Sequence, residues 1–234
     1  MTKLSLYKAA ERTFTDFAYG KISEDRCSNI DHDSLIAGEM KFSNAVVHHY
    51  ADHDAYFMLV AGSAKVETNG TEVIFGYSDA IWLPRGAKAR FIPDGEATFF
   101  YSFTPGSLPE PLKNAEPTKP SSVYRNADRR YLPRRGKTFT AWMCREVFRD
   151  NSNAMGNGII VYENARMPRI PGFDCYYRCL EGEFRMRTST DLYVLKPGDA
   201  VWMPDVSEML WEIDEYTACA YALHPVDWEI RKAK

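Results

Sequence analysis

Long apolar runs are missing from this chain. No stretch of its 234 residues approaches the length of about 20 apolar residues that a membrane-spanning helix needs. The N-terminal residues also lack the apolar core of a signal peptide. We therefore expect a cytoplasmic protein that has no membrane partner.

The chain also has little net charge and no even set of cysteines that could form paired disulfides. The formal net charge of −3 gives no general electrostatic case for a nucleic-acid partner. The five cysteines are odd in number and fit no paired framework, so reduced thiols are the simpler interpretation. Aromatic residues are plentiful by contrast, with 14 Tyr, 13 Phe and 5 Trp, which is typical of β-architecture and of pockets that stack small molecules.

An internal repeat is the strongest global pattern. Residues 38–105 align with residues 158–225 without a gap, at a constant offset of 120. Half of the 14 identical pairs are glycines, prolines or aromatics, as where Trp82 meets Trp202. Such residues fix backbone geometry, so the duplicated unit is a fold. The period is too long for a solenoid and predicts two similar domains.

Short strands are predicted throughout each repeat. In the first repeat, strand-like segments at 44–49, 55–61 and 64–68 lead to a hairpin turn at Asn69-Gly70. The second repeat runs in parallel, and neither repeat carries a sustained helical period. Many short strands at regular spacing predict an all-β sandwich or a closed barrel.

The repeat boundaries predict five segments along the chain. We expect an N-terminal arm with the first strands, a first barrel, a connector rich in proline and charge, a second barrel and a short tail. Their ranges are 1–37, 38–105, 106–137, 138–228 and 229–234. The arm could cross from one barrel to the other.

A motif for the fold lies at residues 197–204, which read Pro-Gly-Asp-Ala-Val-Trp-Met-Pro. Gly-Asp is turn chemistry, and the proline ends a strand where no ladder bond is needed. This run resembles the second sequence motif of the cupin superfamily, and residues 78–86 echo it in the first repeat. Cupins are double-stranded β-helices of jelly-roll type, so the resemblance implies an all-β bicupin with two tandem barrels. A bicupin can pair its sheets inside one chain, which leaves a monomer and a homodimer both open.

A closer resemblance is to the cupin family of the ethanolamine-utilisation protein EutQ. The residues that carry it are Glu163-Asn164-Ala165, Pro168, Asp174, Leu180-Glu181-Gly182 and the ending Tyr221…Pro225…Trp228. The match covers residues 158–228, with a weaker echo at 38–105. It implies a setting in small-amine or carboxylate catabolism, but no particular reaction, because cupins host many activities.

Metal-binding cupins carry three histidines and one glutamate, a set that suits Fe, Mn, Ni or Zn. In the second repeat these positions hold Pro168, Ile170, Cys175 and Met209. Proline and isoleucine cannot complete a metal site, so we expect no cofactor in the second barrel.

The same positions of the first repeat hold His48, Tyr50, Ala55 and Ala89. A rearranged divalent-metal site built from His48, His53 and Asp54 is the alternative. Strand alternation, which sends His48 and His49 to opposite faces, favours a polar hairpin tip or an imidazole that binds a ligand by hydrogen bonds.

The cupin register points to the second barrel as the place of a small-molecule site. Tyr177 is expected to face inward, and with Glu163 it could form a catalytic acid/base couple, since an apolar barrel raises the pKa of a carboxylate. An inward arginine would bind a substrate carboxylate through two hydrogen bonds. Whether Arg185 or Arg187 faces inward stays open. The predicted substrate-binding residues are Arg169, Asp174, Cys175, Arg187, Met209 and Trp211.

These features predict a metal-independent protein that binds a small-molecule ligand in its second barrel. If it is an enzyme, acid/base work such as isomerisation, lyase action or hydrolysis on a small amine or carboxylate would follow. Two alternatives stay open. One is a metal-dependent enzyme that uses the rearranged site of the first barrel, and the other is a non-catalytic binding or scaffold module.

Overall fold

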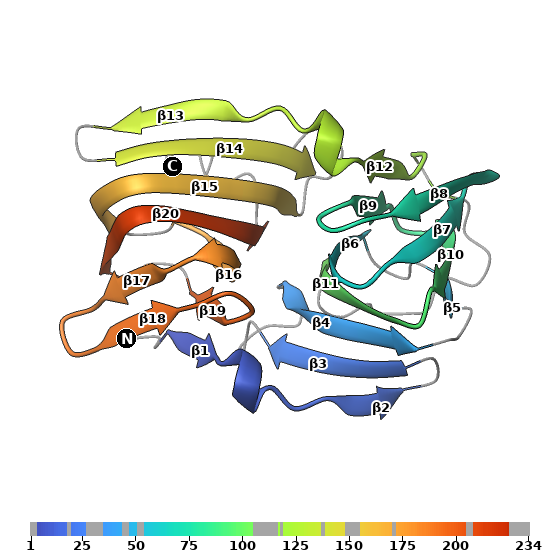
Figure 1. Cartoon of the computed structure of the whole chain (residues 1–234), viewed down its shortest axis with the longest axis horizontal. Helices are drawn as coiled ribbons and strands as arrows, with labels where there is room; N and C mark the ends of the chain where they lie inside the picture. Colours follow the sequence, from blue (N-terminus) through green and yellow to red (C-terminus); the bar gives the residue numbers. More distant parts are fainter. Residues whose placement is uncertain are drawn as a thin grey trace. The chain divides into compact units, whose positions relative to one another are not determined.

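The computed structural model describes residues 4–17, 20–26, 35–43, 47–50, 54–104, 117, 119–136, 139–147, 155–169, 172–204 and 208–224. In these ranges β-strands are the main secondary structure, with two short 3₁₀ turns and no α-helix (Figure 1). The described part of the chain has no helix with the length and apolar character needed to span a bilayer.

Two compact units make up the chain. The first-barrel unit is Thr13–Arg129, and the second-barrel unit is Arg130–Lys234 together with Met1–Arg12. The predicted barrel ranges fall inside these units. The predicted N-terminal arm, however, is divided, because its first twelve residues belong to the second-barrel unit and the rest to the first.

The first-barrel unit packs two antiparallel sheets around an aromatic core. Its described residues form a seven-stranded sheet in the order β12-β9-β6-β11-β4-β3-β2 and a four-stranded sheet in the order β5-β10-β7-β8. The strands are β2 (Thr15–Phe17), β3 (Gly20–Arg26), β4 (Ile36–Ser43), β5 (Val47–Tyr50), β6 (Asp54–Ala61), β7 (Ala64–Thr68), β8 (Thr71–Phe75), β9 (Ala80–Leu83), β10 (Lys88–Pro93), β11 (Glu96–Thr104) and β12 (Ser122–Tyr124).

Apolar side chains fill the interior of this unit. Phe57 and Phe91 meet edge to face with ring centroids 5.1 Å apart, and Phe99 packs 5.4 Å from Phe91. Ala55, Phe57 and Leu59 of β6 belong to this core and are at most 1% exposed.

The second-barrel unit forms a nine-stranded sheet in its described residues. The path is β1-β19-β16-β20-β15-β14-β13, and β17 joins β20 and β18 off this path. The strands are β1 (Ser5–Tyr7), β13 (Leu132–Gly136), β14 (Phe139–Val147), β15 (Gly156–Arg169), β16 (Asp174–Gly182), β17 (Phe184–Arg187), β18 (Leu192–Leu195), β19 (Ala200–Met203) and β20 (Met209–His224). The register of β15 shifts between Glu163 and Ala165, where Asn164 has a φ of 45°, so this long strand is bulged in its middle.

A short segment before each barrel repeats as well. Residues 5–12 read Ser-Leu-Tyr-Lys-Ala-Ala-Glu-Arg, and residues 122–129 read Ser-Val-Tyr-Arg-Asn-Ala-Asp-Arg. Each forms a three-residue strand followed by a 3₁₀ turn, and we call each a strap. Tyr7 pairs with Ala200 of β19, and Tyr124 pairs with Ala80 of β9 in the same register. Each strap therefore precedes one barrel in the sequence and pairs within the unit of the other.

The aspartate of the cupin motif holds each strap. Asp199 accepts hydrogen bonds from Lys8 Nζ and from the backbone N–H of Ala9, both at 2.8 Å. Its counterpart Asp79 accepts one from the backbone N–H of Asn126 at 2.7 Å and lies 3.3 Å from Arg125 Nη2. The identity of these two aspartates in the repeat thus has a structural reason.

Candidate functional site

The interior of the second barrel holds a cluster of large aromatic side chains. Tyr162, Tyr177, Trp211 and Tyr221 are each at most 3% exposed. The Trp211 ring lies 5.5 Å from that of Tyr162 and 5.6 Å from that of Tyr177, both edge to face. Strands β15, β16 and β20 supply these residues. Alternate side chains of a strand point to the same face, and on these strands that face is the barrel interior.

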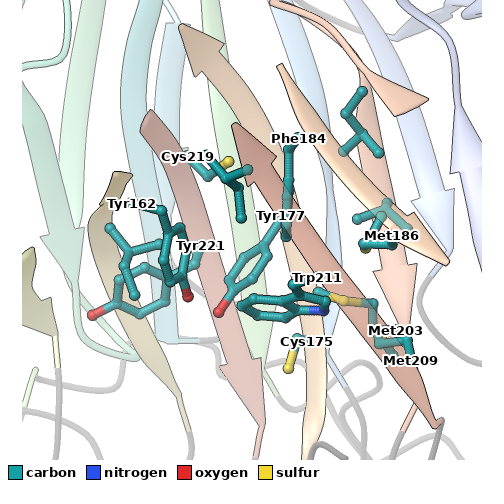
Figure 2. Packing of buried hydrophobic residues seen from close by; sticks show 14 of the residues in the cluster. Tyr162, Cys175, Tyr177, Phe184, Met186, Met203, Met209, Trp211, Cys219 and Tyr221 are labelled. Carbon is teal, nitrogen blue, oxygen red and sulfur yellow. The ribbon is translucent and has the colours of Figure 1, made fainter. Parts of the chain in front are cut away.

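The polar atoms of this cluster gather at one end. Figure 2 shows the phenol oxygens of the three tyrosines and the Cys175 sulfur at the same end of the cluster, with Cys219 at the other end. Tyr162 and Tyr177 share a hydrogen bond between their hydroxyls, and the Tyr221 hydroxyl donates to the carbonyl of Cys144 at 3.1 Å.

Burial keeps these phenols neutral. It raises the pKa of Tyr177 well above its usual value, and the nearby Cys175 thiol raises it further. Burial also raises the pKa of Tyr162 and of Tyr221. At neutral pH each phenol is therefore protonated, so Tyr177 can donate a proton or a hydrogen bond but cannot serve as a base.

A cation that has no counter-ion among the described residues lies at this end of the barrel. The guanidinium carbon of Arg169 is 5.3 Å from the centre of the Trp211 ring and 5.7 Å from that of Phe173. Within the described part of the chain Arg169 has no ion-pair partner, and its buried Nε–H lacks a hydrogen-bond acceptor. The buried Nε1–H of Trp211 also lacks one among these residues. Buried N–H groups normally have acceptors, so a bound anion or water would complete this arrangement.

Five predicted site residues come together here. Arg169 and Met209 are cross-strand partners on β15 and β20, and Met209, Cys175, Tyr177 and Trp211 belong to one buried cluster. We call the set Arg169, Cys175, Tyr177, Met209 and Trp211 the Arg169 end.

Glu163 does not join Tyr177. Its neighbour Tyr162 points into the barrel, so Glu163 points to the outer face, where it is exposed and lines a surface hollow. The predicted acid/base couple of Glu163 and Tyr177 is therefore not assembled in the structure, because the barrel wall separates the two side chains. Tyr162 takes the place beside Tyr177 instead.

Asp174 and Arg187 also lie away from the Arg169 end. Asp174 alternates with the inward Cys175 on β16 and is half-buried on the other face. Arg187 is 52% exposed and ion-paired with Glu212 at 3.1 Å. On β17, Met186 points into the barrel. Its two neighbours, Arg185 and Arg187, therefore both face outward.

Sequence reasoning missed Tyr162 and Tyr221. A signal was present for Tyr162, since the parity of β15 allows only one of Tyr162 and Glu163 to face inward. The bulge at Asn164 hid it, because a register shift breaks the simple alternation on which such a prediction depends.

The donors of the second barrel do not fit the metal set of three imidazoles and one carboxylate. At the expected positions Pro168 is exposed, Cys175 and Met209 are buried, and Ile170 lies outside the described residues. The described ranges contain no group of three or more His, Cys, Asp or Glu that could hold an ion.

The rearranged metal site of the first barrel falls mostly outside what the structure describes. His53 and the side chain of His48 both lie outside the described residues. Asp54 Oδ1 accepts a hydrogen bond from the backbone N–H of Arg85 at 3.0 Å, so at least one of its oxygens fixes a turn. The metal alternative stays a prediction.

One family model matches both halves of the chain, over residues 16–109 and 140–230, and it describes the ethanolamine utilisation protein EutQ. The chain belongs to the EutQ family. No curated protein matches this EutQ-family chain.

Solved structures with the same fold are distant in sequence. A protein of the DUF861 family from Pseudomonas syringae pv. tomato has a TM-score of 0.67 at 13% identity, over 94% of this chain and 100% of its own. A putative glyoxylate-induced protein from Pseudomonas aeruginosa has a TM-score of 0.75 at 12% identity, over 94% and 88%.

An oxalate decarboxylase from Bacillus subtilis, described with Mn(II) centres, has a TM-score of 0.65 at 14% identity, over 94% of this EutQ-family chain and 77% of its own. At such identities the likeness shows the fold alone. Together with the two matched segments, it establishes a bicupin.

Proposed function

We propose that this EutQ-family bicupin binds a small organic carboxylate at the Arg169 end of its second barrel, without a metal ion. The observation that carries the proposal is the half-buried guanidinium of Arg169, which stacks on two aromatic rings and has no counter-ion among the described residues. Arginine is the side chain best shaped to bind a carboxylate through two parallel hydrogen bonds.

The surrounding groups suit such a ligand. The Trp211 Nε1–H offers another donor, and the neutral Tyr177 hydroxyl lies in the same cluster. Met209 and the Trp211 ring offer apolar surface for the carbon skeleton. The cation of Arg169 would repel an ammonium group, so carboxylates fit this end better than amines. Oxalate decarboxylase, which shares the fold, is named for a small dicarboxylate.

Tyr177 is the group we propose as a proton donor if the ligand is turned over. Its raised pKa allows donation but leaves no tyrosinate at neutral pH to act as a base. A carboxylate bound by Arg169 and not converted would make the protein a binding module instead. Tyr177→Phe separates these outcomes, since it should abolish turnover while carboxylate binding persists.

Calorimetric titration with acetate, lactate, glyoxylate and oxalate tests the binding proposal. Arg169→Gln should weaken the best ligand by about 10-fold or more, because a charge-assisted hydrogen bond contributes about 1.5–3 kcal/mol. Arg187→Gln removes the same charge from the outer face of the barrel and should leave the affinity unchanged. Equal losses in both variants, or preference for the matching amides, would contradict the proposal.

A further inference from the structure

A surface hollow of about 350 Å³ lies on the outer face of the second-barrel unit. It is lined by Tyr131, Trp142, Val161, Glu163 and Tyr216. Three of the five are aromatic and one is a carboxylate. Its volume is within the range of about 300–1,000 Å³ that small-molecule sites occupy.

Strand register explains why these residues meet. Strands β14, β15 and β20 are neighbours in the sheet, as Figure 1 shows. Trp142 pairs with Val161, and Glu163 pairs with Tyr216. Val161 and Glu163 share the outer face of β15 because Tyr162 between them points inward. Trp142 and Tyr216 therefore flank Val161, while Glu163 adds a negative charge.

The hollow presents aromatic and acidic side chains to solvent. Tyr131 is 36% exposed and Tyr216 is 40% exposed, although most large aromatic residues of this unit are buried. Within the described ranges, Glu163 has neither an ion-pair partner nor a side-chain hydrogen bond. Thr140 pairs with Glu163 on one side and with Arg135 on the other, so the three residues lie in one row across the sheet. Arg135 nevertheless makes no ion pair with Glu163.

We propose that this hollow binds a small organic cation that carries a methylated ammonium group. The faces of tryptophan and tyrosine rings attract cations, and the Glu163 carboxylate adds to that attraction. A methylated ammonium is weakly hydrated and offers methyl groups to the rings, which suits an open aromatic surface better than the strongly hydrated –NH₃⁺ group does.

This site is independent of the Arg169 end. The two lie on opposite faces of β15 and carry opposite charges, so a carboxylate and an ammonium ion would each reject the other's site. A substitution that removes one site need not affect the other. Each site can therefore be tested in a variant that leaves the other site intact.

Choline is the probe, and its uncharged isostere 3,3-dimethylbutan-1-ol is the control ligand, both titrated into the whole chain by calorimetry. We expect choline to bind about 10-fold tighter than the isostere, since cation–π contacts contribute about 0.5–2 kcal/mol. Trp142→Leu and Glu163→Gln should each weaken choline by about 5- to 10-fold. Glu181→Gln, which neutralises an exposed carboxylate outside the hollow, should leave the choline affinity unchanged.

Three results would overturn the proposal. The first is no choline binding, or equal affinity for choline and the isostere. The second is choline affinity that survives both Trp142→Leu and Glu163→Gln, with native far-UV circular dichroism confirming that both variants fold. The third is a trimethyllysine peptide that binds more than 10-fold tighter than choline, which would assign the hollow to a protein partner instead of a small molecule.

Discussion

At the scale of single residues, strand alternation gives the two faces of β15 different chemistry. Tyr162 and Glu163 are sequence neighbours, yet Tyr162 is 3% exposed inside the barrel while Glu163 lines the outer hollow. Farther along the same strand, Arg169 brings a positive charge to the aromatic cluster. One strand thus contributes residues to both proposed sites, because successive side chains face opposite ways.

The buried phenols predict that stability falls in alkali. Their pKa values are raised in the folded state, so above the ordinary phenol pKa of about 10 the unfolded chain loses protons that the folded chain keeps. The free energy of unfolding should then decrease as pH rises past about 10. Urea midpoints measured from pH 8 to 11 check this, and Tyr162→Phe should flatten the decline. A midpoint independent of pH would contradict it.

At the scale of elements, turn glycines explain why the repeat kept certain positions. Gly182 has a φ of +77°, and a Cβ there would lie 1.9 Å from the Tyr216 carbonyl oxygen. Gly62 has the same role in the first barrel, with a φ of +79° and a Cβ position 2.1 Å from the Glu96 carbonyl oxygen. Only glycine fits both the backbone angle and the space at these turns.

Gly182→Ala should therefore destabilise the chain by about 3 kcal/mol or more, from backbone strain and from the clash with Tyr216. Gly70→Ala is the matched control. Gly70 also has a positive φ, of +72°, but nothing lies within 4 Å of its Cβ position. Strain alone should cost about 1–2 kcal/mol there. Thermal denaturation of both variants checks the ranking, and equal losses would show that the clash is relieved.

The strap contact depends on the charge of Asp199. Burial raises the pKa of this carboxyl, but hydrogen bonds from Lys8, Ala9 and Lys196 outweigh burial and lower it overall. A lowered folded pKa means that the stabilisation is complete above the ordinary Asp pKa of about 3.9 and is lost as pH falls through the lowered folded value. Acid should weaken this strap contact.

Asp199→Ala should lower the free energy of unfolding by about 1–3 kcal/mol at pH 7, because it removes three part-buried hydrogen bonds. Asp214→Ala removes an exposed ion pair with Arg185 and should change it by less than about 1 kcal/mol. Urea unfolding of both variants provides the comparison. A loss in Asp214→Ala as large as in Asp199→Ala would show that the strap contributes little.

At the scale of the whole molecule, the strap at residues 5–12 ties the second-barrel unit to a segment distant in sequence, whereas the strap at residues 122–129 ends the first-barrel unit itself. The strap at residues 5–12 covers one edge of β19, and the strap at residues 122–129 covers one edge of β9. An uncovered strand edge leaves backbone groups without partners. The integrity of each unit therefore depends on the segment that precedes the other barrel.

Deletion of residues 1–12 should expose β19 while leaving β9 covered. Hydrogen exchange measured by mass spectrometry should accelerate in residues 200–203 and stay unchanged in residues 80–83. The second strand serves as the internal control. Equal acceleration in both strands, or in neither, would contradict the strap assignment.

Much of the fold was predictable because its signals are local. The turn residues of the 120-residue repeat and the Gly-Asp motif at Asp199 act through backbone geometry that neighbouring residues impose. The straps were not found, because residues 5–12 and 122–129 repeat at an offset of 117 instead of 120. A similarity of eight residues at a different offset is weak evidence for a repeat until the strands that the two segments pair with are known.

Residue order alone predicted the two cupin barrels and the poor fit of the second barrel to the usual metal ligands, and it named the five residues that the structure brings together at the Arg169 end. Turn geometry and residue chemistry are properties of short segments, which a sequence displays directly. Burial and strand pairing were needed to show that Tyr162 and not Glu163 lies beside Tyr177, and that Arg187 faces outward. The bulge at Asn164 and the pairing of distant strands set those directions, and neither follows from the order of residues along one strand.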